Sequence, residues 1–148
     1  MPWWQMENNP MPVNSSSRLT ASNELLTRQI HPSQMSDGRP SARSFTPTDK
    51  DGGHLSADRA SLLHPKDAYE RYLHRKQLAS AGGTWGVSIN EFESFNLCCY
   101  GDPLEGSEAH TLVDFNTAGD ARKQQSLGKL VYAKAKARGR LHPPPDVV

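Results

Sequence analysis

Three short alternating segments lie between two stretches with helical spacing, and this arrangement limits the fold more than any other feature. Thr84–Ile89 (TWGVSI), Phe95–Tyr100 and Ala109–Phe115 each place apolar residues at alternate positions, as strands with one buried face do. The segments are not separated by helices in a regular βαβ order. The sequence therefore predicts an α+β fold with a small, mainly antiparallel sheet and two principal helices.

The two helices are predicted from their end signals and their apolar spacing. Pro65 suits the first turn of a helix within Ser61–Ala79, and the second helix is predicted over Thr117–Arg138. Asp120, three residues after Thr117, resembles part of a capping arrangement. Gly128 lies inside the second helix and is expected to weaken it by ~1 kcal/mol relative to alanine.

The composition predicts one ordered domain with polar tails. Leu, Ile, Val and Phe together make up about 18% of the chain, a fraction typical of disorder, but the net charge is only +1 and disorder also requires a high net charge. We therefore expect a disordered tail over residues 1–24, one α+β domain over 25–141 and a Pro-rich tail over 142–148. Trp3 and Trp4 are expected to dock on the chain's own domain.

The sequence has no apolar run of the ~18–20 residues that cross a bilayer and no secretory signal, so a cytoplasmic location without membrane contact is predicted. Cys98 and Cys99 are adjacent, which disfavours a disulfide between them and lacks the ligand spacing of a zinc site. Two reduced, buried thiols are expected. The sequence predicts neither a cofactor nor a bound metal.

A long connection, Ser33–Gly53, follows the first predicted strand, Leu25–Ile30. Connections longer than ~12–15 residues are usually functional or disordered, and Phe45 is expected to anchor this one to the core. Arg39 and Arg43 are candidate ligand-binding residues, because a guanidinium group matches phosphate or carboxylate geometry. The alternative is that the arginines of this region hold the loop by donating to backbone carbonyls.

Arg28, His31 and His110 are the candidate catalytic residues. They come from separate segments, as active-site residues usually do. Strand alternation places Arg28 and His31 on opposite faces, so only a change of direction at Pro32 would bring them together. His110 shares a strand face with Asp114, but the two lie ~13 Å apart along the strand. The alternative is that His31, His110 and also His54 are structural or solvent-facing.

The predicted second helix and the residues just after it are strongly basic. They contain Arg122, Lys123, Lys129, Lys134, Lys136, Arg138 and Arg140. Lys134, Lys136 and Arg138 are therefore candidate ligand-binding residues, and the Arg122–Arg140 segment is a candidate nucleic-acid surface. The alternative is a solvated face that complements the helix macrodipole.

Several short segments resemble a family of uncharacterised small bacterial proteins. RQIHP, GRP, F-x-P, KD and LS lie within Arg28–Ser56, and AYERY, TWGVSI and AHTLVDF follow. The resemblance covers most of residues 25–140. It implies a small bacterial cytoplasmic domain and carries no activity.

Two functions are therefore predicted. The first is a binding module that contacts a protein or nucleic-acid partner through the 33–53 loop and the basic helix. The alternative is a small nucleotide- or nucleic-acid-modifying enzyme, analogous to ADP-ribosyl transferases, that uses Arg28, His31 and His110. Glu91 or Glu93 would then be its acidic residue. A polar pocket would favour the enzyme, and a flat basic or apolar patch would favour the binding module.

Overall fold

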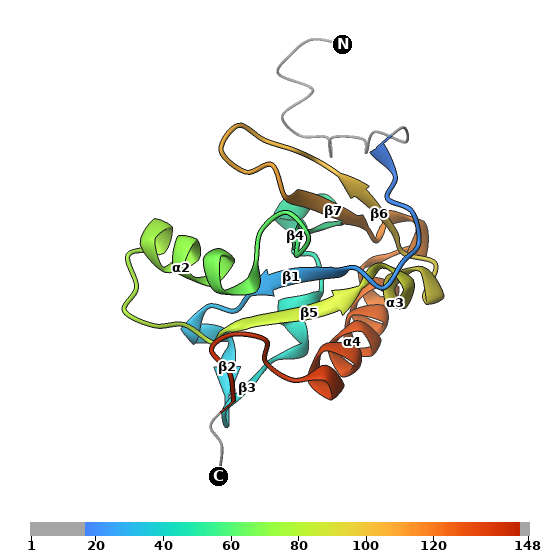
Figure 1. Ribbon diagram of the computed structural model, residues 1–148. Helices are drawn as coiled ribbons and strands as arrows, with labels where there is room; N and C mark the ends of the chain where they lie inside the picture. The colour runs from blue at the N-terminus through green and yellow to red at the C-terminus, as the bar shows by residue number, and fades with distance from the viewer. Residues whose placement is uncertain (1–16, 146–148) are drawn as a thin grey trace.

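The structure is a computed structural model that describes residues 17–145, so the predicted docking of Trp3 and Trp4 lies outside the described residues. Its centre is a five-stranded sheet in the order β5-β1-β4-β7-β6, with every neighbouring pair antiparallel (Figure 1). The predicted α+β class is confirmed. The strands are β1 (Leu25–Gln29), β4 (His54–Arg59), β5 (Thr84–Ser88), β6 (Cys98–Gly101) and β7 (His110–Asp114).

The two principal helices cover opposite faces of this sheet. Val131 and Ala135 of α4 (Ala121–Arg138) join the apolar core with Leu26, Val87 and Val113. The predicted inward residues Trp85, Val87, Val113 and Phe115 are all buried, as is the predicted anchor Phe45. The other helix, α2 (Pro65–Lys76), lies over the opposite face, where the Thr84 hydroxyl donates to the Pro65 carbonyl.

The 33–53 connection has local structure of its own. It contains a two-stranded hairpin and 3-10 turns: η2 (Pro32–Gln34), β2 (Met35–Ser36), β3 (Arg39–Pro40), η3 (Ala42–Phe45) and η4 (Asp49–Asp51). The strand that follows it, β4, was not predicted. Its sequence, HLSADR, has no β-branched residue, and its strand conformation is set by pairing with β7 along five positions.

The prediction of a strand over Phe95–Tyr100 is only partly right, because β6 begins at Cys98 and a short helix, α3 (Ile89–Ser94), precedes it. The Ser88 hydroxyl accepts from the Glu91 backbone N–H, while the Glu91 carboxylate accepts from the Ser88 N–H. This capping box satisfies two backbone donors and starts the helix.

Helix ends also differ from the prediction. Asp120, not Thr117, is the N-cap of α4, since its carboxylate accepts from the Lys123 backbone N–H and Thr117 lies in the 3-10 turn η5 (Asn116–Ala118). The first helix ends at Lys76, three residues before the end of the predicted Ser61–Ala79 range, because Gln77 adopts a left-handed conformation.

Packed residues extend on both sides of the predicted 25–141 range. Arg18 forms an isolated β-bridge with Tyr100, and His142 forms one with Thr84. Glu24 forms an ion pair with Arg59 at 2.9 Å. Burial raises the pKa of Glu24, but hydrogen bonds from Arg59 and Ser61 outweigh burial and hold this pKa below its ordinary value. Within residues 17–145, no helix is long and apolar enough to cross a membrane.

Candidate functional site

A gap inside the sheet creates the site. β1 and β4 are neighbours, but they pair only at Leu26–Arg59 and Thr27–Asp58, whereas β1 pairs with β5 at all five of its positions. Beyond Thr27 the two strands separate. A cavity of about 520 Å³ opens there, lined by β1, β4, β7, α2 and the η2 segment. We refer to it as the α2 cavity.

Arg28, His31 and His110 all line the α2 cavity, so the three predicted catalytic residues lie together. β1 ends at Gln29, and His31 lies outside the strand as the N-cap of η2. The alternation that separates Arg28 from His31 therefore no longer applies at position 31. The change of direction before Pro32 brings both side chains to one space.

Arg28 is also a structural link. Its Nε donates to the Ser44 carbonyl at 2.7 Å, and its Nη1 donates to the Ser56 carbonyl. These bonds join β1 to the 33–53 connection and to the part of β4 that does not pair with β1. Burial lowers the pKa of Arg28 to about 10, which still leaves the guanidinium charged at neutral pH. The predicted alternative, an arginine that holds the loop through carbonyls, thus describes part of what Arg28 does.

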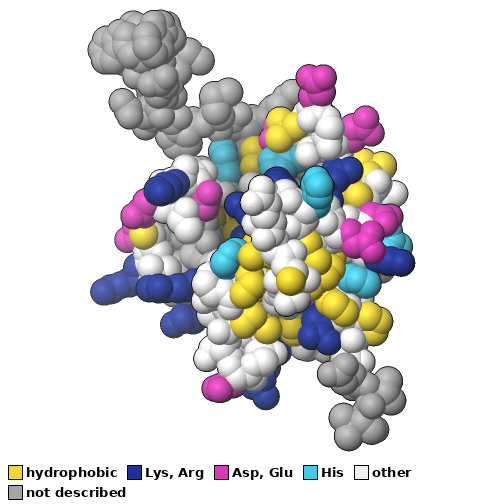
Figure 2. All heavy atoms as spheres, turned by 90° about the vertical axis from the view of Figure 1, so that its left-hand side faces the viewer, with side chains coloured by type: hydrophobic (Ala, Val, Ile, Leu, Met, Phe, Trp, Pro, Cys, Tyr) yellow, Lys and Arg dark blue, Asp and Glu magenta, His cyan; other side chains and the backbone are white. Residues whose placement is uncertain are grey.

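The lining of the α2 cavity is strongly basic. Four cationic side chains line it, Arg28, Arg71, Arg75 and Lys76, and Asp58 is the one carboxylate among the lining residues. The whole chain carries a net charge of only +1, so this concentration of positive charge is local. Figure 2 looks onto the α2 side of the molecule, where histidine side chains gather in the middle and upper part of the face, with Asp and Glu mostly at its borders.

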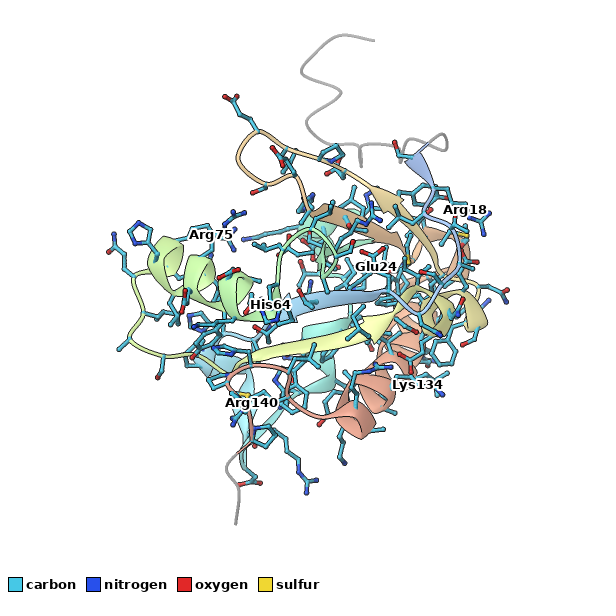
Figure 3. All side chains as sticks on the ribbon, in the orientation of Figure 1. Arg18, Glu24, His64, Arg75, Lys134 and Arg140 are labelled. Carbon is cyan, nitrogen blue, oxygen red and sulfur yellow. The ribbon has the colours of Figure 1, made fainter. Side chains whose placement is uncertain are left out.

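Helix α2 supplies three of these cations from one side. Arg71 and Arg75 are four residues apart and therefore lie one above the other. Arg75 stacks over the Tyr72 ring at 5.7 Å from its centroid, and Arg71 Nη1 donates to the Gly106 carbonyl at 3.1 Å. Figure 3 shows Arg75 between α2 and the loop that precedes β7. The role of α2 in lining the cavity was not predicted from the sequence.

His110 lies between two carboxylates. Its Nδ1 is 2.9 Å from the Asp102 carboxylate, and Asp58 is its directly opposite partner on β4. Burial raises the pKa of Asp58, and the charges of His110 and the nearby arginines only partly offset this effect. The predicted acidic residues Glu91 and Glu93 do not line the cavity, so Asp58 replaces them as the acidic candidate.

The predicted ligand-binding residues lie elsewhere and do not form one site. Arg39 is exposed on the β2–β3 hairpin. Arg43 lines a second cavity, of about 620 Å³, between residues 42–53 and the start of α4. Lys134 and Arg138 line a third, of about 350 Å³, and Arg138 forms an ion pair with Glu91 at 2.8 Å. Lys136 is exposed on α4, and Figure 3 shows Lys134 on the other side of the sheet from Arg75.

The remaining candidates are not part of the α2 cavity. His54 is buried beside Asp114, with its Nε2 3.8 Å from the carboxylate. Cys99 is fully buried, and burial raises the pKa of its thiol to about 12. No cluster of three or more His, Cys, Asp or Glu side chains within residues 17–145 has the geometry to hold a metal ion.

Comparisons with known proteins give no information on the function of the α2 cavity. No protein-family model matches the chain, and neither a curated protein nor a solved structure matches it. The resemblance of its short motifs to small bacterial proteins therefore stays a prediction, and function has to be argued from the geometry of the site.

Proposed function

We propose that the protein binds a phosphate-bearing small molecule, such as a nucleotide, in the α2 cavity. The observation that carries this proposal is the cavity lining, which combines four cationic side chains and two histidines with a single carboxylate. Anions are attracted to such a lining, and the attraction is strongest near Arg28, because this side chain is only partly exposed whereas Arg71, Arg75 and Lys76 are exposed. The volume of about 520 Å³ lies within the range of small-molecule sites.

Hydrogen-bond donors around the cavity fit the same ligand class. Arg28 uses two of its donors on backbone carbonyls and keeps the others, and Arg71 uses one on Gly106. Arginine donors in a partly buried site bind phosphate oxygens in pairs, which favours phosphate over a less charged ligand. The α2 cavity contains the residues of the predicted enzyme alternative, Arg28, His31 and His110, and not the surface of the predicted binding module.

The proposal is tested by titrating the protein with pyrophosphate, ADP and ADP-ribose, with adenosine as the uncharged control, and by following heat release or thermal stabilisation. The charged compounds should bind, and adenosine should not. Arg75→Ala should weaken pyrophosphate binding at least ~10-fold, as expected for the loss of a charge-assisted contact. Lys66→Ala is the matched control, because Lys66 is an exposed cation on α2 that does not line the cavity. Equal affinity for all ligands, or equal effects of both variants, would contradict the proposal.

The predicted binding module remains a second candidate because of the charge on α4. This helix has no acidic residue, and Arg122, Lys129 and Lys136 repeat every seven residues on its exposed side. The η3 segment of the 33–53 connection packs against the same helix. A continuous surface of loop and helix is thus available to an acidic partner, and we propose nucleic acid as that partner.

Charge reversal tests this second surface. Lys134 and Lys136 are both exposed, so Lys134→Glu with Lys136→Glu should preserve the fold. Nucleic-acid affinity should fall in the double variant, and for the wild type it should fall steeply with salt because each neutralised phosphate releases counterions. The matched control is Lys66→Glu. Absence of wild-type binding to RNA and DNA at ~50 mM salt, where screening is weak, would remove this candidate.

A further inference from the structure

Both histidines of the α2 cavity have a hydrogen-bond partner at Nδ1, but the partner of His110 is an acceptor and the partner of His31 is a donor. The Asp102 carboxylate lies 2.9 Å from His110 Nδ1, and an ionised carboxylate only accepts, so Nδ1 of His110 carries the proton. The Ser33 backbone N–H donates to His31 Nδ1 at 3.1 Å, so this nitrogen holds the lone pair. In the neutral rings, Nε2 of His110 is therefore an acceptor and Nε2 of His31 is a donor.

Asp58 completes this arrangement from the neighbouring strand. Residues directly opposite each other in an antiparallel pair project to the same face, with Cβ atoms ~4.5–5.5 Å apart, so the Asp58 and His110 side chains are neighbours. Asp58 also faces Arg71 and Arg75 from α2 and Arg28 from β1. Burial raises its pKa despite these charges, so its neutral, proton-donating form persists to higher pH than in an exposed aspartate.

We propose that the α2 cavity hydrolyses a phosphoric ester, with His110 as general base and Asp58 as general acid. This inference rests on the proposed binding of a phosphate-bearing ligand. His110 Nε2 removes a proton from water as the water oxygen bonds to phosphorus. The bond between phosphorus and the leaving oxygen breaks, and Asp58 transfers its proton to that oxygen. His110 then releases the proton it gained to bulk water and Asp58 takes one up from water, so both groups are restored.

The other cavity residues act on the charge that develops in this step. Arg71 and Arg75 neutralise the phosphoryl oxygens, and the His31 Nε2–H donates to one of them. Asp102 does not touch the substrate. It is a positioning residue, because it fixes the His110 tautomer and stabilises the imidazolium that forms when His110 takes the proton.

The experiment compares phosphate monoesters and diesters that carry either a p-nitrophenyl or a methyl leaving group, with released alcohol measured directly. The p-nitrophenolate ion leaves without a proton, whereas methoxide needs one. His110→Ala should lower kcat/KM at least ~100-fold for every ester that the wild type cleaves. Asp58→Asn should lower it at least ~100-fold for the methyl ester and less than ~10-fold for the p-nitrophenyl ester. His74→Ala, on the exposed side of α2, is the control and should leave the rates unchanged.

Asp102→Asn separates positioning from a structural role, since it should lower kcat with KM unchanged. Pyrophosphate titration of each variant reports whether the cavity is intact. Wild-type protein that binds pyrophosphate and cleaves none of the esters would overturn the hydrolytic step alone, whereas failure to bind pyrophosphate would overturn the proposed function as well. Full activity in His110→Ala would overturn the role of that histidine, and equal losses for both leaving groups in Asp58→Asn would overturn the role of that aspartate.

Discussion

The substitution Gly128→Ala reverses the usual effect of replacing a helical glycine. In a helix interior, alanine is more favourable than glycine by ~1 kcal/mol. Gly128 is buried against the η3 segment, and a Cβ atom at this position would lie 1.8 Å from Thr46 Oγ1, 3.0 Å from Thr46 Cβ and 3.2 Å from the Phe45 carbonyl oxygen. The new methyl group therefore has no free space.

The size of the effect follows from which of these contacts can relax. Rotation of Thr46 would remove the shortest contact but would break the hydrogen bond from its hydroxyl to the Ala42 carbonyl, which is 3.3 Å long. The Phe45 carbonyl belongs to the backbone beside a fully buried side chain, so it moves only if η3 shifts. Overpacking of this kind costs ~1–3 kcal/mol. After the ~1 kcal/mol gain in helix propensity, the free energy of unfolding should fall by about 1 kcal/mol.

Urea denaturation measures this change, and a double-mutant cycle assigns its cause. In a Thr46→Ala background the 1.8 Å contact is absent, so Gly128→Ala should be neutral or stabilising there. The coupling energy between the two positions should reach ~1–2 kcal/mol, within the range for residues in direct contact. If Gly128→Ala stabilises the wild type by the full ~1 kcal/mol, the close approach of α4 and η3 does not exist in solution.

Three further predictions concern the core, acid stability and thiol reactivity. Val113→Asp should abolish soluble expression because it places an unpaired charge at a fully buried position of β7, and an equally stable variant would show that the register is wrong. The pKa of Glu24 lies below its ordinary value of 4.5, so its pair with Arg59 stabilises the fold above about pH 4.5 and this contribution is lost as the pH falls through the folded pKa. Glu24→Gln should flatten acid denaturation in that range, and an unchanged pH profile would contradict the ion pair's role. With the Cys99 pKa at about 12, iodoacetamide at pH 8 should label only Cys98 in the native protein and both thiols after unfolding, whereas rapid native labelling of Cys99 would refute its burial.

The sequence was informative about the fold wherever side-chain spacing alone decides structure. The alternation of Trp85 and Val87 predicted β5 and the face that joins the apolar core, because a period of two puts these side chains on one face, although the residues of the other face are buried as well. β4 could not be found in this way, since HLSADR has weak strand preference and becomes a strand through its neighbours. The S-x-x-E signal of α3 was present at Ser88 and Glu91, but the alternation of apolar residues placed Ser88 in the predicted strand Thr84–Ile89.

The residues of the candidate site likewise fall into those that the sequence identified and those that only the structure revealed. Arg28, His31 and His110 were identified by residue type, and their convergence depended on the change of direction at Pro32. Asp58 was missed because its strand was missed. The α2 cations could not be assigned, since helical spacing shows which residues share a side but not what that side faces, and only the docking of α2 beside the β1–β4 gap turns Arg71 and Arg75 toward the cavity.

The position of β1 in the sheet has a consequence for how the chain folds during synthesis. β1 is made first of the five strands, yet its principal partner is β5, and Gln29 bonds to Thr84 across 55 residues. A nascent chain that ends before β5 can pair β1 with β4 at only two positions, and strands left largely unpaired are prone to aggregate or to be bound by chaperones. Sheet formation must wait for distant contacts, which slows folding relative to a helical domain of this size. On the ribosome, we expect protease resistance to appear only after β7 has emerged, in one late step rather than strand by strand.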